Sequence, residues 1–340
     1  MKSKGLGAAV ACALMVSMLA GCGSTTSTTS GQTGEAADSS AYDPVTITVD
    51  LARSGLGDKV EETFTTPPTH VVAKGDQMAD YFFDLGLEEN MAGYSHGSCH
   101  STVSQYAARD TVRVLGNSDN PNTITKEELL STGCDFLIGW DSTFSDKNFN
   151  KDFCQENGIN MYTPYCTSDS ATFEDIYKDY ETLGKIFNVE DLASTKIQAM
   201  KDKISNVKSA LGDSAYNNPV SVFVYDSGED APFTACQGMP GDIIKLAGGK
   251  SIFSDINKGW DTVSWEQVVE RNPSAILILD YNGETQEKED FLYSNEALSS
   301  VDAVKNHRIY SACCSDIQGS AGSAGTVEQL AKEFYPDLFK

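Results

Sequence analysis

A helical repeat of apolar residues near the middle of the chain constrains the fold more than any other feature. Apolar or small side chains recur at every third or fourth position, at Val189, Ala193, Ile197, Met200, Ile204, Val207 and Leu211. Gly212 follows and is predicted to end the helix. A helix of this length spans about 30 Å, the width of a small domain. We predict a rigid helix that joins two lobes; the alternative is one more helix inside a single core.

Short apolar runs on both sides of this helix predict buried strands. They lie at 71–73, 136–138, 159–162, 220–225, 275–279 and 308–311. A helical pattern near 78–85, ending at Gly86, follows the first run. Strands that alternate with helices are typical of α/β proteins with parallel sheets.

The two halves of the chain repeat one helix–strand unit. Thr125 with Glu128, and Ser264 with Gln267, each match the capping box that starts a helix, and a predicted strand follows each. Matched units favour two lobes of similar build. The predicted fold is therefore α/β, with two similar lobes of mostly parallel sheet joined by one long bridging helix.

The N-terminus has the layout of a secretory signal. Lys2 and Lys4 precede an apolar run that ends near Ala20, too short for a comfortable membrane span. The segment before Cys22 resembles the bacterial lipoprotein signal, in which the cysteine becomes the first residue and carries a diacylglycerol. We expect a signal peptide at 1–21 and lipidation of Cys22; an ordinary secretory signal is the alternative.

The residues that follow divide into a tether and the predicted lobes. Segment 22–43 is rich in Ser, Thr and Gly, cannot bury enough apolar surface to order itself, and is predicted to be a flexible tether. The N-terminal α/β lobe is expected at 44–172, the bridging helical segment at 173–212 and the C-terminal α/β lobe at 219–340.

The charge balance excludes whole classes of partner. Lys and Arg number 25 against 49 Asp and Glu, a formal net charge of −24. Such a surplus of carboxylates repels the phosphates of nucleic acid and disfavours docking to anionic lipid through a basic patch. A cationic, neutral or metal-bearing ligand remains compatible with this charge.

From about Thr69 to its end, the sequence resembles the ABC-importer substrate-binding proteins of the iron-chelate and vitamin B12 type. The opening strand and helix, 70–73 with 85–87, and the segment Phe173–Phe187 with Leu183 and Gly184 match the family pattern. The most specific match is an ordered set in the second half, made of 232–234, 243–249, Trp260, Val263, Ser264 and Glu266. The turns at 133–135 and 272–274 keep only part of the usual Pro-Asp pair.

The resemblance implies partners as well as a fold. It implies a monomer held outside the cell membrane by its lipid, which hands a small-molecule metal chelate to an ABC permease and its ATPase. Glu127 and Glu266 match the glutamates that pair with permease arginines, one on each lobe. First-turn glutamates also complement the helix dipole, which is the alternative role for both.

Ligands of two-lobe α/β proteins bind at the carboxyl ends of the strands. Trp140 and Trp260 match positions where the B12-binding members place tryptophans, and packing within each lobe is their alternative. Carboxylates at 226–230 are candidates to receive a cationic group or a ferric ion, or they form a solvated acidic loop. The residues predicted to face the cleft are Met78, Tyr94, His96, Trp140, Tyr165, Tyr225, Asp226, Glu229, Trp260 and Tyr281.

A second, weaker possibility is a metal site at His96, Cys99 and His100, because the two histidines would share one face of a helix. No resident cofactor and no catalytic residue are predicted. The sequence does not show how Cys99, Cys134, Cys154, Cys166, Cys236, Cys313 and Cys314 pair, if they do.

The leading hypothesis is a lipid-anchored binding protein of an ABC importer that captures a ferric chelate, either a siderophore or haem. The same role for cobalamin or another corrinoid is the first alternative. A surface sensor, or an enzyme that uses Cys99 with His96 or His100, is the alternative from another class. The chain has no nucleophile elbow, HExxH motif, P-loop or dinucleotide-binding glycine motif, which argues against an enzyme.

Overall fold

A computed structural model of the protein describes residues 42–51, 59–97, 106–116 and 123–340. Residues 42–340 form one compact unit. The signal peptide, Cys22 and all but the last two residues of the predicted tether lie outside the described residues. Among the residues that are described, no helix combines the length and the apolar character that crossing a bilayer requires.

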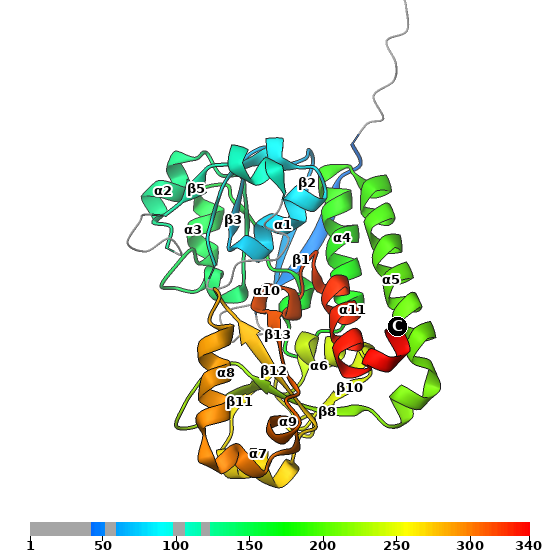
Figure 1. Ribbon diagram of the computed structural model, residues 1–340. Helices are drawn as coiled ribbons and strands as arrows, with labels where there is room; N and C mark the ends of the chain where they lie inside the picture. The colour runs from blue at the N-terminus through cyan, green and yellow to red at the C-terminus, as the bar shows by residue number, and fades with distance from the viewer. Residues whose placement is uncertain (1–41, 52–58, 98–105, 117–122) are drawn as a thin grey trace, which may run out of the picture. The chain divides into compact units, whose positions relative to one another are not determined.

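The N-terminal lobe, blue to blue-green in Figure 1, is built on a five-stranded parallel sheet with strand order β5-β4-β3-β6-β7. Its strands are β3 (Val71–Lys74), β4 (Met91–Ser95), β5 (Val114–Leu115), β6 (Phe136–Ile138) and β7 (Asn160–Tyr162). Its helices are α1 (Asp76–Asp84), α2 (Lys126–Ser131) and α3 (Lys151–Glu156). An antiparallel hairpin, β1 (Val45–Asp50) with β2 (Lys59–Phe64), adds its alternate apolar side chains to the core.

The C-terminal lobe has a four-stranded parallel sheet in the order β10-β8-β12-β13. Its strands are β8 (Val220–Tyr225), β10 (Gly249–Ser251), β12 (Ala275–Asp280) and β13 (Ile309–Cys313), and β9 (Phe233–Ala235) pairs separately with β11 (Trp260–Thr262). Its helices are α6 (Gly238–Leu246), α7 (Trp265–Arg271), α8 (Thr285–Ser294), α9 (Asp302–Lys305), α10 (Cys314–Ile317) and α11 (Ser323–Phe334).

Two helices connect the sheets, α4 (Phe173–Phe187) and the longer α5 (Glu190–Asn217). The predicted apolar positions of α5 are its buried face, from Ala193 to Leu211. Lys196 pairs with Asp84 of α1 at 2.7 Å, while the Tyr216 hydroxyl donates to the Leu246 carbonyl at the end of α6. Contacts with helices of both lobes confirm that α5 bridges them.

The fold prediction is therefore confirmed, with one refinement at Gly212. The backbone of Gly212 has φ 62° and ψ 175°, so the regular helix breaks there as predicted, but another turn continues to Asn217. The hairpin β1–β2 and the strands β4, β5 and β9 to β11 were not among the predicted elements.

Candidate functional site

The carboxyl ends of the two sheets enclose two adjoining cavities. The larger, about 400 Å³, is lined by Lys74, Gly75, Asp76, Gln77, His96, Gly97, Trp140, Ser142, Tyr281, Ser315 and Gln318. The smaller, about 160 Å³, shares Trp140 and Gln318 with it and adds Asp141, 166–169, 237–240, Gly259 and Trp260. Because the walls come from both lobes, this cleft is the candidate site.

One tryptophan from each lobe faces the cleft. Trp140 follows β6 and precedes a 3₁₀ turn, Asp141–Phe144, so the end of the strand delivers its indole to the wall. Trp260 begins β11 and stacks on Phe233, with the ring centroids 5.6 Å apart and the planes 17° from parallel. Both tryptophans line the smaller cavity, where broad apolar surfaces can contact a flat ligand.

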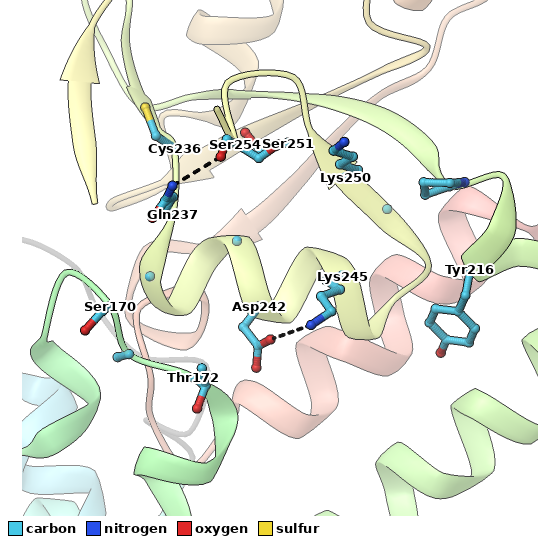
Figure 2. Close-up of a pocket in the computed structure, with 15 residues that line it drawn as sticks. Ser170, Thr172, Tyr216, Cys236, Gln237, Asp242, Lys245, Lys250, Ser251 and Ser254 are labelled. Atoms are coloured by element: carbon cyan, nitrogen blue, oxygen red, sulfur yellow. Dashed lines mark hydrogen bonds and ion pairs between the residues drawn. The ribbon is translucent and has the colours of Figure 1, made fainter. Parts of the chain in front are cut away.

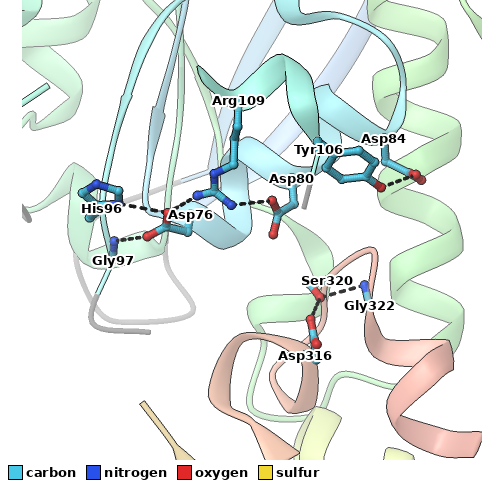
Figure 3. A network of polar contacts seen from close by, with 10 residues as sticks. All are labelled: Asp76, Asp80, Asp84, His96, Gly97, Tyr106, Arg109, Asp316, Ser320 and Gly322. Atoms are coloured by element: carbon cyan, nitrogen blue, oxygen red, sulfur yellow. Dashed lines mark hydrogen bonds and ion pairs between the residues drawn. The ribbon is translucent and has the colours of Figure 1, made fainter. Parts of the chain in front are cut away.

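The first residue of α1 anchors the N-terminal wall of the cleft. The fully buried Asp76 carboxylate accepts from the Gly97 N–H at 2.8 Å, lies 3.1 Å from His96 Nδ1 and binds the Arg109 guanidinium (Figure 3). Arg109 also reaches Asp80 at 3.3 Å. The Asp76–Arg109 ion pair is buried, and removing either partner would leave an uncompensated charge, so Asp76 stays in place. Asp76 in turn holds His96 at the edge of the cavity.

A hydrogen-bonded pair positions the opposite wall. Tyr281 follows β12, and its hydroxyl donates to the buried Asp226 carboxylate, which also accepts from Ser227 Oγ at 2.7 Å. Burial, together with the neighbouring Cys314 and Asp226, raises the pKa of the Tyr281 phenol far above its ordinary value. Tyr281 therefore faces the cavity as a neutral ring held by Asp226.

The turn after β7 is held from inside the lobe by Asp179 of α4. Its carboxylate accepts from the backbone N–H groups of Tyr165 and Cys166 at 2.7 and 3.0 Å, and from the Tyr162 hydroxyl at 2.6 Å. Complete burial raises the pKa of Asp179 to about 6, although these hydrogen bonds oppose the shift. Asp179 thus fixes the turn Tyr165–Thr167, which contributes to the smaller cavity.

Four of the ten residues predicted to face the cleft line it: His96, Trp140, Trp260 and Tyr281. The other six do not line these cavities. Met78, Tyr94 and Tyr225 are buried in the cores, and Asp226 supports Tyr281 from behind. The Tyr165 ring lies against Lys178, and Glu229 is exposed with its carbonyl bound to Trp265 Nε1 at 2.6 Å.

Several wall residues lie outside the predicted cleft residues and loops, among them Lys74, Asp169, Ser315 and Gln318. Lys74 ends β3, whereas Gln77 and Asp141 belong to the loops 75–78 and 140–142, which were expected at the cleft. Ser315 and Gln318 come after β13, a strand that the sequence analysis did predict. Its carboxyl end was therefore the signal that would have located them.

The structure does not test the alternative metal site at His96, Cys99 and His100. Cys99 and His100 lie outside the described residues, and His96 is bound to Asp76. In the part of the chain that is described, no three His, Cys, Asp or Glu side chains are grouped to hold a metal ion.

Four of the cysteines, Cys134, Cys154, Cys166 and Cys236, are buried free thiols. Burial raises the pKa of Cys134 and of Cys154 to about 12, so neither forms the thiolate that a nucleophile needs.

A larger cavity, about 510 Å³, lies along the edge strand β10 of the C-terminal lobe (Figure 2). Its walls come from α6, β10 and the segment 170–172, with Tyr216 of α5 and Pro219 just before β8. It shares Gln237 and Gly238 with the smaller cavity of the cleft. Asp242 in its wall accepts from the Phe173 N–H at 2.9 Å and so already caps α4.

Glu127 and Glu266 occupy the same position on two helices, the second residue of α2 and of α7, and both are exposed. The local structure of the repeat differs between the copies. Ser264 and Gln267 complete the predicted capping box, whereas Thr125 caps α2 while Glu128 turns away to the Gly116 N–H at 3.1 Å. Hydrogen bonds from its own N–H and from Ser264 lower the pKa of Glu266.

The periplasmic binding protein family matches residues 71–312. An uncharacterised ABC transporter substrate-binding lipoprotein of Bacillus subtilis is 24% identical over 327 residues, 95% of each chain. A vitamin B12-binding protein of Pectobacterium atrosepticum is 26% identical over 197 residues, 53% of this chain and 68% of that protein.

Structural similarity covers more of the chain than the family match. A periplasmic binding protein from Veillonella parvula has a TM-score of 0.79 at 27% identity, covering 86% of this chain and 99% of that one. The vitamin B12-binding protein of Vibrio cholerae, at 17% identity, shares the fold with a TM-score of 0.61, covering 80% and 98%. With most of its length matched by the family, this chain belongs to the periplasmic binding proteins.

Proposed function

We propose that the protein is the extracytoplasmic substrate-binding component of an ABC importer, and that it captures a metal chelate in the cleft between its lobes. One observation carries the proposal: side chains from both sheets line one continuous set of cavities at the carboxyl ends of the strands. A ligand bound there contacts both lobes at once, as a carrier that encloses its cargo requires. The proposal includes no chemistry on the ligand.

The ligand is proposed to be a ferric chelate, with a corrinoid as the second candidate. One observation favours the corrinoid: Trp140 and Trp260 line the same cavity, which suits a flat macrocycle. The carboxylates at 226–230, which favoured a ferric chelate in the sequence, give this ligand less support than the tryptophans give the corrinoid. Asp226 is occupied by Tyr281 and Ser227, and Glu229 does not line the cavities.

Membrane attachment through Cys22 is part of the proposal. The sequence around Cys22 supports it, and the Bacillus subtilis relative is named a lipoprotein. A flexible tether after the lipid would let the body reach a permease in the same membrane.

Docking to the permease is proposed to use Glu127 and Glu266. Their exposure and matched helix positions support this role, since an exposed carboxylate can take a bidentate arginine. The double variant Glu127→Ala with Glu266→Ala should bind the chelate like the wild type but lose its uptake into cells. The matched control is Glu156→Ala with Glu270→Ala, which removes two other exposed helix carboxylates and should import normally.

The same experiment distinguishes the other function classes. Normal uptake by the docking variant would contradict the assignment of the two glutamates. A surface sensor would keep its output in this variant, and an enzyme would turn over its substrate in the purified protein without a permease.

A further inference from the structure

We propose that the cleft selects chelates that are neutral or positively charged and rejects chelates that carry net negative charge. This inference rests on the proposed function, because it assigns a charge class to the cargo of the same cleft. It rules out catecholate and citrate complexes and haem with two ionised propionates, and it keeps neutral or cationic hydroxamate chelates and corrinoids.

The charges that line the cleft are mostly negative. Asp76, Asp141 and Asp169 face the two cavities, and Lys74 is the one lysine or arginine among their described lining residues. Asp76 shares the Arg109 guanidinium with Asp80, which adds a second carboxylate behind the wall. The local charge is therefore negative even when Arg109 and Lys74 are counted.

Asp141 and Asp169 give the walls of the smaller cavity their negative charge. Asp141 accepts a hydrogen bond from the adjacent Ser142 N–H at 2.6 Å, and within the described residues neither Asp141 nor Asp169 forms an ion pair. Asp169 closely approaches two glycines of the other lobe: a Cβ on Gly259 would lie 2.6 Å from Asp169 Oδ1, and one on Gly238 2.9 Å from the Asp169 carbonyl oxygen.

None of the four described arginines lines the two cavities, and each has a partner. Arg109 lies behind the wall with Asp76, Arg113 pairs with Glu128 at 3.7 Å, and Arg271 pairs with Asp255. Arg308 donates to the Phe334 carbonyl at 3.0 Å. Of the internal segments outside the described residues, 98–105 and 117–122 contain no lysine or arginine in their sequence, and 52–58 contains one, Arg53.

Lys74 does not reverse this balance. It is partly buried at the end of β3, and desolvation lowers the pKa of its ammonium. One weakened cation can neutralise one acidic group of a ligand, but the other carboxylates of the wall then repel any further negative charge. The net charge of −24 acts in the same direction on a chelate that approaches from solution.

A charge series on one iron centre tests the proposal. The probes are a linear ferric trihydroxamate with a terminal ammonium, its N-acetylated neutral form and its N-succinylated anionic form. Cyanocobalamin and its monocarboxylate derivative form a parallel corrinoid pair. Binding is followed at low ionic strength by quenching of tryptophan fluorescence, since Trp140 and Trp260 line the cleft.

In whichever series binds, the anionic member should bind at least about tenfold more weakly than the neutral one, which is about 1.4 kcal/mol. The cationic hydroxamate should bind at least as well as its neutral form. Equal or tighter binding of the anion would overturn the charge inference and leave the binding function intact. If no member of either series bound, the assignment of neutral or cationic hydroxamates and corrinoids would be overturned, and binding of haem or a ferric catecholate instead would leave the metal-chelate function intact.

Variants assign the effect to the cleft. The double variant Asp141→Asn with Asp169→Asn should reduce the difference in binding affinity between the neutral and the anionic probes. The matched control, Asp213→Asn with Asp230→Asn, removes two exposed carboxylates that do not line the cavities and should keep the full difference. If this difference in affinity were the same in both double variants, the role given to Asp141 and Asp169 would be overturned.

Discussion

Asp179 is a buried carboxylate whose ionisation is linked to stability. Its neighbours are the Tyr162 and Tyr81 phenols, the Cys166 thiol and the backbone at Tyr165, with no cation among the causes of its shift. Its pKa is about 6 in the folded chain and 3.8 as an ordinary side chain, so folding takes up a proton between these values. The stability that this protonation adds is complete below pH 3.8 and is lost as the pH rises through 6.

Asp179→Asn removes this titration. The free energy of unfolding of the wild type, relative to the variant, should therefore rise as the pH falls from 7 to 5. Urea unfolding at pH 5, 6 and 7 measures the difference between the two proteins. A difference that stays constant over this range would show that Asp179 does not titrate there.

Single residues also show where sequence-based prediction of the site succeeds and fails. Trp140 was predictable because it directly follows a short buried strand and emerges at the sheet edge. Tyr225 also ends a strand, but its ring turns into a second core with Trp265 and Phe291. The side of the sheet that a last strand residue faces depends on packing by distant residues, which the local pattern does not contain.

At the scale of elements, six of the nine described strands in the two main sheets follow from apolar runs, while β4, β5, β10 and the β9–β11 pair do not. Strand β11 is three residues long and contains no fully buried residue, and among the described strands it pairs only with β9, which is antiparallel to it. Strand β1 of the hairpin does carry a sequence signal, because Val45, Ile47 and Val49 alternate with polar residues. The hairpin was therefore predictable from the sequence, although it was not predicted.

The break in α5 gives the prediction at this scale. Gly212, with φ 62° and ψ 175°, occupies a region that is essentially restricted to glycine, so Gly212→Ala should destabilise the fold by about 1–3 kcal/mol through backbone strain. Nothing within 4 Å would contact the new methyl group, which excludes a steric clash as the cause.

Gly325 of α11 is the matched control. Its φ is not positive, and a Cβ there also meets nothing within 4 Å. Gly325→Ala should therefore leave stability unchanged or raise it by up to about 1 kcal/mol, because alanine favours the helix. Urea unfolding compares the two variants, and a shift of the same sign in both would refute the assignment of strain to Gly212.

At the scale of the whole molecule, the lobes meet at the cleft as well as through α4 and α5. The fully buried Cys166 thiol lies 3.3 Å from the Tyr81 hydroxyl and 3.6 Å from the Gly319 carbonyl. Gly319 has φ 100°, and a Cβ there would lie 2.9 Å from Cys166 Cβ. This close approach joins the turn after β7 to the segment after β13, so the two cavity walls are mechanically connected.

Gln77 is the polar link across this junction, and it supplies the prediction for the whole molecule. Its side-chain amide donates to the carbonyls of Gln318 and Gly319, and the residue lines the larger cavity. Gln77→Leu keeps the volume but leaves buried carbonyls without this donor, which costs about 1–3 kcal/mol in the closed arrangement and favours opening. Amide hydrogen exchange over residues 318–323 should therefore accelerate, while β3 and β12 stay protected.

The same substitution at Gln198 separates opening from a general loss of stability. Gln198 is exposed on α5 and donates to Asp202 of the same helix at 2.7 Å, so Gln198→Leu breaks a hydrogen bond without touching the lobe junction. Exchange over 318–323 should match the wild type in this control. Faster exchange in the control, or unchanged exchange in Gln77→Leu, would mean that the lobes are held by the apolar contacts around Cys166 rather than by this amide.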